Sequence, residues 1–240
     1  MKEETVVLRG YRQNIPESEK VQAIHQAALA ATDFSWLHRG DSVLIKPVNN
    51  SGKPYPATTD PVAAFAMIHL LKEKGAGRVV VGDLAGIGDV AFHKTHIQGC
   101  TRALMEKSGL AQAVAKAGGE LCCFEEPGWD AFYPEMPLHG TNWREPLMVS
   151  GTLQDVDHIV LLPRCAHHFM AGASLGLKAA IGYCRTDTRL MLHKEAASFS
   201  EKIAEANTIL TLVKKQRLVL TVADKVLTTY GPNEGCVIQT

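Results

Sequence analysis

Short β-branched segments alternate along this chain with longer segments of helical periodicity. The candidate strands are Thr5–Leu8, Ser42–Lys46, Arg78–Gly82, Glu120–Phe124, His158–Leu162 and Leu218–Val222. Much of the chain between them has a helical pattern, in Glu17–Ala31, Asp60–Lys74, Thr101–Ala117 and Lys194–Lys214. Strands that alternate with helices form parallel sheets, because a crossover helix returns the chain to the edge where the previous strand began. The sequence therefore predicts an α/β fold, with a layered and mainly parallel sheet flanked by helices.

One stretch, residues 125–146, breaks this alternation. It contains four prolines together with Trp129 and Trp143. Large aromatic side chains favour packing against a core, so we interpret this stretch as an irregular excursion and not as a flexible linker. The chain is long enough to bury a substantial core. We expect one α/β domain over residues 1–240.

Charge and hydropathy exclude several classes of partner. Lysine plus arginine and aspartate plus glutamate both number 25, whereas nucleic-acid-binding proteins usually carry a basic excess. No apolar run approaches the ~20 residues that a membrane-spanning helix needs. The acidic start of the chain lacks the features of a secretory signal. We therefore expect a cytoplasmic protein that binds neither nucleic acid nor membrane.

The six cysteines are scattered along the chain and form no Cys-x-x-Cys pair. This spacing excludes the usual zinc-ribbon and iron–sulfur cluster motifs. In a cytoplasmic protein, isolated cysteines are mostly small buried side chains, and a disulfide framework is not expected.

Polar residues follow several of the candidate strands. Lys46 ends one strand and Asp83 follows the next, while Arg164 and Asp224 come shortly after two later strands. Open parallel sheets bind ligands beyond the carboxyl ends of their strands. We expect Lys46, Arg164 and Asp83 to contact a small anionic or carbonyl substrate at this edge. Asp224 is a candidate metal ligand.

The segment 163–193 carries the largest number of reactive side chains. Three histidines, one lysine and three arginines surround the small residues 171–176, where a ligand can approach the backbone closely. Lys178 can act as a nucleophile or as a partner of an anion. His168 and His193 can carry protons or bind a transition metal. We predict His168 and Lys178 as catalytic residues and His193 as a metal ligand.

Several motifs resemble the uncharacterised family known as domain of unknown function 362. They include Val43–Pro47, Thr58–Pro61 and Val79–Asp83, and the order continues through Ala171-Gly172, Lys178, Gly182 and the Gly-Pro turn at residue 231. The resemblance implies an association with iron–sulfur redox proteins, which are often encoded beside or fused to members of this family. Two departures are notable: Ala166 stands where the family usually has lysine, and the family usually continues beyond the position of Thr240.

A second resemblance concerns the pattern H-x-x-A-G-x-S-x-G-x-K, which begins at His168. It is similar to a stretch in lactate-racemase-type nickel-pincer enzymes. Carried over by motif, His168 would be an acid–base residue, Lys178 would hold the cofactor and His193 would bind nickel. The family's substrate arginine has no counterpart, because Asp60 stands in its place.

Two functions remain open from the sequence. The first is an isomerase or oxidoreductase that acts on a small molecule with the help of a metal or a bound cofactor. The second is a non-catalytic module that binds a redox protein partner, and the proline- and tryptophan-rich stretch 125–146 motivates it.

Overall fold

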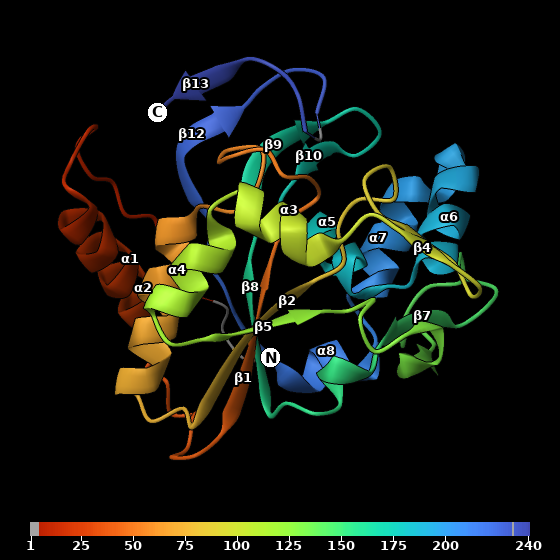
Figure 1. The fold of residues 1–240 in the computed structure, drawn as a ribbon, viewed down its shortest axis with the longest axis horizontal. Coiled ribbons are helices and arrows are strands. Elements are labelled where there is room, and N and C mark those ends of the chain that lie inside the picture. Colours follow the sequence, from red (N-terminus) through yellow and green to blue (C-terminus); the bar gives the residue numbers. More distant parts are fainter. Residues whose placement is uncertain (1–4, 232) are drawn as a thin grey trace.

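The computed structural model describes residues 5–231 and 233–240. Its centre is a sheet of five strands, all parallel, in the order β11–β8–β1–β2–β5 (Figure 1). The strands are β1 Ser42–Pro47, β2 Arg78–Asp83, β5 Glu120–Cys123, β8 His158–Leu162 and β11 Gln216–Val219. The predicted fold class is therefore confirmed.

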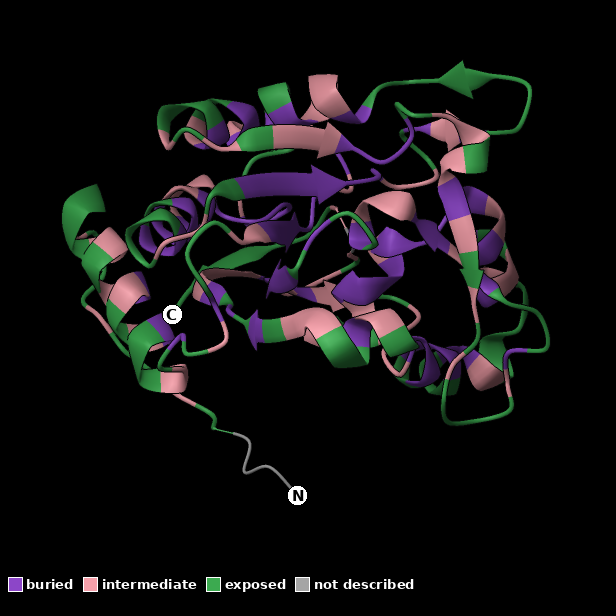
Figure 2. Cartoon of the chain, turned by 90° about the horizontal axis from the view of Figure 1, so that it is seen from below, coloured by how far each residue is buried: buried purple, intermediate pink, exposed green. Residues whose placement is uncertain are grey.

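Helices cover both faces of this sheet, because its central strands are apolar on both sides. Val43 and Ile45 pack on one face, whereas Leu44 packs on the other. The helices on the first face are α1 Glu17–Ala31, α2 Pro61–Glu73, α3 Thr101–Lys107 and α4 Leu110–Lys116. Those on the second face are α6 Thr186–Lys194, α7 Phe199–Ala206 and α8 Leu210–Lys215. Figure 2 shows the buried strands between these two layers.

A second, smaller sheet lies beyond the carboxyl ends of the parallel strands (Figure 1). Only Pro163 separates β8 from β9, so the chain runs directly from one sheet into the other. The strands of the second sheet are, in order, β10 Gly172–Ser174, β9 Arg164–His168, β12 Val222–Leu227 and β13 Val237–Gln239. The short helix α5, Gly176–Ala179, follows β10. These elements bring the reactive segment 163–193 to the carboxyl edge of the parallel sheet.

The stretch 125–146 packs against the domain, as its aromatic content predicts. Its strand β6, Phe132–Glu135, pairs with β7, Leu147–Ser150, in an antiparallel hairpin. Trp143 is buried, and its Nε1–H donates to the carbonyl oxygen of Lys202 at 2.8 Å. A further small hairpin pairs β3, Ala91–Phe92, with β4, Ile97–Gln98.

Two predicted strands differ from the structure. Thr5–Leu8 forms no strand, and Val6 and Leu8 are exposed, because this segment pairs with no strand in the described part of the chain. The predicted strand Leu218–Val222 is divided in two. β11 ends in the parallel sheet at Val219, and β12 begins at Val222 in the second sheet.

Two long predicted helices are interrupted. The segment Thr101–Ala117 breaks at Gly109, whose φ of +84° is incompatible with a continuous helix. The segment Lys194–Lys214 contains the end of α6 and, after a short 3₁₀ turn, α7 and α8. Over residues 5–231 and 233–240, no helix has both the length and the apolar character needed to cross a membrane.

Candidate functional site

A cavity of about 270 Å³ lies at the carboxyl edge of the parallel sheet. Residues from β1, β9, α5 and α6 line it together with the loop at residues 86–89. The polar and charged side chains that line it include Lys46, His168, Lys178, Arg189, His193 and Asn233. The structure thus brings together four of the seven predicted site residues in one cavity, and two more lie directly behind its wall.

Lys46 and Asp83 form a buried ion pair at this edge. The Nζ atom of Lys46 lies 2.8 Å from Oδ1 of Asp83, and the two side chains are 1% and 2% exposed. Lys46 also donates to the carbonyl oxygen of Pro47, while Asp83 accepts from the backbone N–H of Asn49. Burial lowers the pKa of Lys46 despite the neighbouring carboxylate. These two predicted substrate contacts therefore neutralise each other.

Arg164 is a fully buried cation behind the cavity wall. Its Nη1 atom donates to Oδ1 of Asn233, which lines the cavity, over 3.5 Å. Its Nε and Nη2 atoms have no acceptor within the described part of the chain. Burial lowers the pKa of Arg164 to about 10. Unsatisfied donors at full burial are costly, so they mark a place where an acceptor from a ligand is favoured.

Lys178 projects from α5 into the cavity. Its Nζ atom makes no hydrogen bond and no ion pair with the residues that the structure describes. Burial, together with the charges of Arg189, Arg164 and Lys46, lowers its pKa to about 8. Lys178 is therefore a cation that loses its proton far more readily than an ordinary lysine.

The two cavity histidines are held in opposite tautomers. Nδ1 of His168 accepts from the backbone N–H groups of Met170 and Ala171, each at 3.2 Å, so the neutral ring carries its proton on Nε2. Nδ1 of His193 donates to the carbonyl oxygen of Arg189 at 2.6 Å, so its Nε2 keeps a lone pair. Nε2–H of His168 can thus donate a hydrogen bond, whereas the lone pair on Nε2 of His193 can accept a proton or bind a metal.

Both histidines are held neutral by their surroundings. Burial, with the charges of Lys178 and His193 adding to it, lowers the pKa of His168 to about 3. Burial also lowers the pKa of His193. Each ring can therefore act in its neutral form near pH 7.

Arg189 is a site residue to which the sequence analysis gave no role. Its Nε, Nη1 and Nη2 atoms donate to the carbonyl oxygens of Cys184, Ala85 and Gly182, all within 2.7 Å. It thereby joins the loop after β2 to the segment that precedes α6. An arginine in a helical pattern gives no sequence signal for such a role.

Positive charge exceeds negative charge around the cavity. Besides the histidines, four cationic side chains lie in or behind its wall, and Asp83 is their buried carboxylate partner. Asp89 lies at the mouth of the cavity and is exposed to solvent. A site with this imbalance of charge favours an anion.

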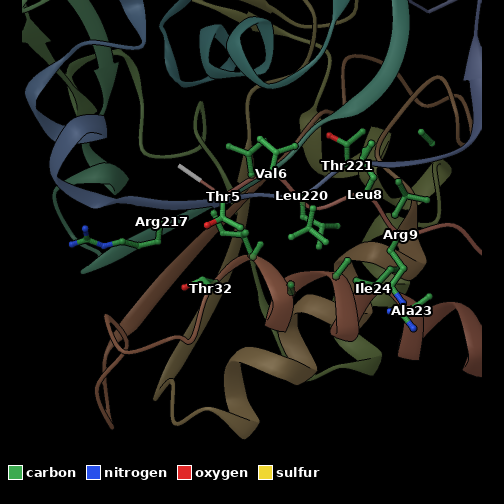
Figure 3. Close-up of a pocket in the computed structure, with 18 of the residues that line it drawn as sticks. Thr5, Val6, Leu8, Arg9, Ala23, Ile24, Thr32, Arg217, Leu220 and Thr221 are labelled. Atoms are coloured by element: carbon green, nitrogen blue, oxygen red, sulfur yellow. The ribbon is translucent and has the colours of Figure 1, made fainter. Parts of the chain in front are cut away.

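Asp224 lies away from this cavity, in β12. Its carboxylate pairs with Lys20 at 2.7 Å and accepts from the hydroxyl of Tyr55. It lines a second and larger cavity of about 1170 Å³, formed by the N-terminal segment, α1 and the link from β11 to β12 (Figure 3). The structure therefore does not bring Asp224 and His193 together. In β12, the carboxylate of Asp224 lies against Lys20 of α1 and Tyr55, contacts that the strand pattern does not signal.

One group of possible metal ligands lies elsewhere, in the loop before β1 and at the start of β8. His38, Asp41 and His158 have ligand atoms within 4.8 Å of one another. Nδ1 of His158, however, accepts from Nε of Arg217, and its Nε2 then donates to Asp41. These bonds explain the group as a hydrogen-bonded cluster.

Comparison with known proteins identifies the family and the fold. The chain is similar to a Thermotoga maritima protein of known crystal structure, with a TM-score of 0.51 and 16% identity over 97% of this chain. The chain spans 55% of the length of that structure. No curated protein matches the sequence. The profile of a family described as "Domain of unknown function (DUF362)" matches residues 43–239, and the chain therefore belongs to the DUF362 family.

Proposed function

We propose that this protein is an enzyme that binds a small carboxylate in the cavity of about 270 Å³ and carries out acid–base chemistry on it. The observation that carries the proposal is the buried guanidinium of Arg164, with two unsatisfied donors and an excess of positive charge around it. A carboxylate provides hydrogen-bond acceptors for the two unsatisfied N–H groups of Arg164 and a negative charge that offsets the surrounding cations.

The unsatisfied edge of Arg164 is the one that this protein uses elsewhere to hold carboxylates. Nε and Nη2 of Arg102 donate to the two carboxylate oxygens of Glu126 at 2.7 and 2.8 Å. The same two atoms of Arg185 hold Asp187 at 3.0 and 2.8 Å. Because Nε and Nη2 form a planar pair of parallel donors, Arg164 is suited to bind a carboxylate in the same way.

His168 and His193 have different roles in the proposed chemistry. Nε2–H of His168 donates to a carbonyl or hydroxyl oxygen of the substrate, and Nε2 of His193 accepts a proton from it. The two histidines have different roles because they are held in opposite tautomers. His168 is thus a hydrogen-bond donor in the proposal, whereas the motif resemblance implies an acid–base residue at this position.

The cavity does not fit a metal held by both histidines. A ligating imidazole nitrogen must carry a lone pair, and Nε2 of His168 carries a proton while its Nδ1 accepts two backbone N–H groups. Asp224, the second predicted ligand, lies in the other cavity. The proposed chemistry therefore uses no metal, and the similarity of residues 168–193 to nickel-pincer enzymes remains a prediction.

The stretch 125–146 does not favour the alternative of a redox-partner module. Trp143 is buried, and the ring of Trp129 lies 4.1 Å from the guanidinium carbon of Arg185. The aromatic side chains that motivated this alternative are thus used in packing.

The test is calorimetric titration of the purified protein with acetate, pyruvate, lactate, malonate and phosphate. We expect saturable binding of at least one carboxylate, weakened tenfold or more in Arg164→Met. Arg102→Met is the matched control, because Arg102 already holds Glu126 at the surface, and its binding should equal that of the wild type. Absence of carboxylate binding, or equal binding by the Arg164 variant, would overturn the proposal.

A further inference from the structure

We propose that Lys178 forms a covalent imine with the carbonyl carbon of a 2-oxo carboxylate bound in the cavity. This inference rests on the proposed function, because the carboxylate of the same molecule occupies the Arg164 side of the site. It adds the substrate class and a covalent step.

Lys178 differs from four other lysines that are buried or half-buried. Lys46 is paired with Asp83, Lys202 with Glu195, and Lys20 with two carboxylates. Lys215 donates to three backbone carbonyl oxygens. The amine of Lys178 has no such partner in the described chain, and it faces a cavity instead. An amine held out of water without a counter-ion is the usual form of a nucleophilic lysine.

The neighbouring charges also favour the reactive form of the amine. Because the pKa of Lys178 is lowered to about 8, roughly a tenth of the amine is unprotonated at pH 7. The nearby cations that disfavour its ammonium form also attract the negative charge of the substrate. The same cations therefore favour both the binding of the substrate and the unprotonated form of Lys178.

The cavity contains the groups that imine formation needs. Nε2 of His193 accepts a proton from the ammonium group of Lys178, and the free amine attacks the carbonyl carbon. The carbonyl π electrons move to oxygen, which accepts a hydrogen bond from Nε2–H of His168. The oxygen first takes up the proton that His193 received from Lys178. The ring of His193 then transfers a second proton from the Lys178 nitrogen to the same oxygen. The oxygen leaves as water, and the carbon–nitrogen double bond forms. The ammonium and the carbonyl thus become a protonated imine and one water molecule, with the charge unchanged.

The volume and the charges select the partner. A cavity of about 270 Å³ holds only a small molecule. A carbonyl compound without a carboxylate would leave Arg164 unsatisfied, whereas a carboxylate without a carbonyl would bind without reacting. A 2-oxo carboxylate satisfies both requirements.

Reductive trapping tests this inference. The purified protein is incubated with pyruvate and sodium cyanoborohydride, digested and analysed by mass spectrometry. We expect one reduced pyruvate adduct on the peptide that contains Lys178, at a yield at least tenfold higher than on any other lysine peptide. Acetaldehyde should modify this lysine at least tenfold less, and excess malonate should suppress the pyruvate adduct.

Two variants separate the covalent step from binding. Lys178→Arg keeps the positive charge but cannot form an imine, so it should bind pyruvate and give no adduct at this position. Lys94→Arg removes an exposed lysine outside the site and should be trapped as well as the wild type. Pyruvate binding without trapping in the wild type would overturn the imine and leave the proposed function intact. Neither binding nor trapping would overturn both.

Discussion

Gly182 lies directly against the buried amine of Lys46. A Cβ atom placed on Gly182 would lie 2.6 Å from Cε of Lys46 and 2.9 Å from Oδ1 of Asp83. The backbone at Gly182 therefore lies so close to the Lys46–Asp83 pair that a residue with a Cβ atom would displace the pair. This contact fixes the floor of the cavity.

The first prediction follows from this contact. Gly182→Ala must displace a buried ion pair, so we expect the free energy of unfolding to fall by about 1–3 kcal/mol. Carboxylate binding should weaken as well, because Lys46 lines the cavity. Urea unfolding and calorimetry measure the two effects. Gly10→Ala is the control, since nothing lies within 4 Å of its added Cβ, and it should cause no loss. Unchanged stability in Gly182→Ala would contradict the close contact.

The second prediction concerns the opposing demands of stability and binding at Arg164. A buried guanidinium with two unsatisfied donors destabilises the folded state. Its burial also lowers its pKa to about 10. Arg164→Met keeps the length of the side chain without the charge. We expect it to raise the free energy of unfolding by about 1–3 kcal/mol in the absence of carboxylate.

Urea unfolding of the Arg164→Met protein, with and without malonate, measures this trade-off. Malonate at concentration c should stabilise the wild type by RT ln(1 + c/Kd), which rises with c, and leave the variant unchanged. If Arg164→Met instead lowered stability in the ligand-free protein, the guanidinium would have to be satisfied in a way that the structure does not show.

The third prediction is a pH dependence set by His168. Its pKa falls from an ordinary 6.5 when unfolded to about 3 when folded, so between these values the unfolded chain binds one more proton. Stability from this group is therefore fully present above pH 6.5 and is lost as the pH falls towards 3. The slope approaches ~1.4 kcal/mol per pH unit within that window.

His168→Asn tests the source of this slope, because an asparagine oxygen can still accept from the backbone N–H groups that Nδ1 now serves. We expect a shallower loss of stability between pH 6.5 and 4 than in the wild type, measured by urea unfolding at several pH values. His93→Asn, at an exposed position, is the control and should keep the wild-type slope. Equal slopes in all three proteins would show that His168 does not titrate as its burial requires.

Much of the fold could be predicted because hydrophobic periodicity records burial. The segments Ser42–Lys46 and His158–Leu162 are apolar on both faces, and they became the central strands β1 and β8. The same periodicity could not distinguish one sheet from two. Leu218–Val222 is apolar except for Thr221, yet the chain leaves the parallel sheet within it. The pairing of β12 with β9 depends on contacts with residues far away in sequence.

The candidate site was predicted in part for a similar reason. Lys46, Asp83 and Arg164 follow parallel strands, so topology alone brings them to one edge. The tautomers of His168 and His193 could not be predicted, because they depend on which backbone group each Nδ1 meets. Asp224 also follows an apolar segment, but that segment is divided between two sheets, and the carboxylate of Asp224 pairs with Lys20 away from the cavity. Sequence order therefore predicted the location of the site better than the role of each side chain.

The last prediction concerns the pH dependence of trapping at Lys178. Imine formation needs the unprotonated amine, whose fraction rises as the pH increases through the pKa of about 8. Below pH 8 the rate of pyruvate trapping should therefore increase almost tenfold per pH unit, and it should level off above pH 8 while Arg164 keeps its charge. An exposed lysine would continue to gain reactivity up to its ordinary pKa near 10.4. Adduct yield at Lys178 and at Lys94, measured in one digest from pH 6 to 9.5, compares the two directly. A parallel rise at both positions above pH 8 would show that the cavity does not activate Lys178.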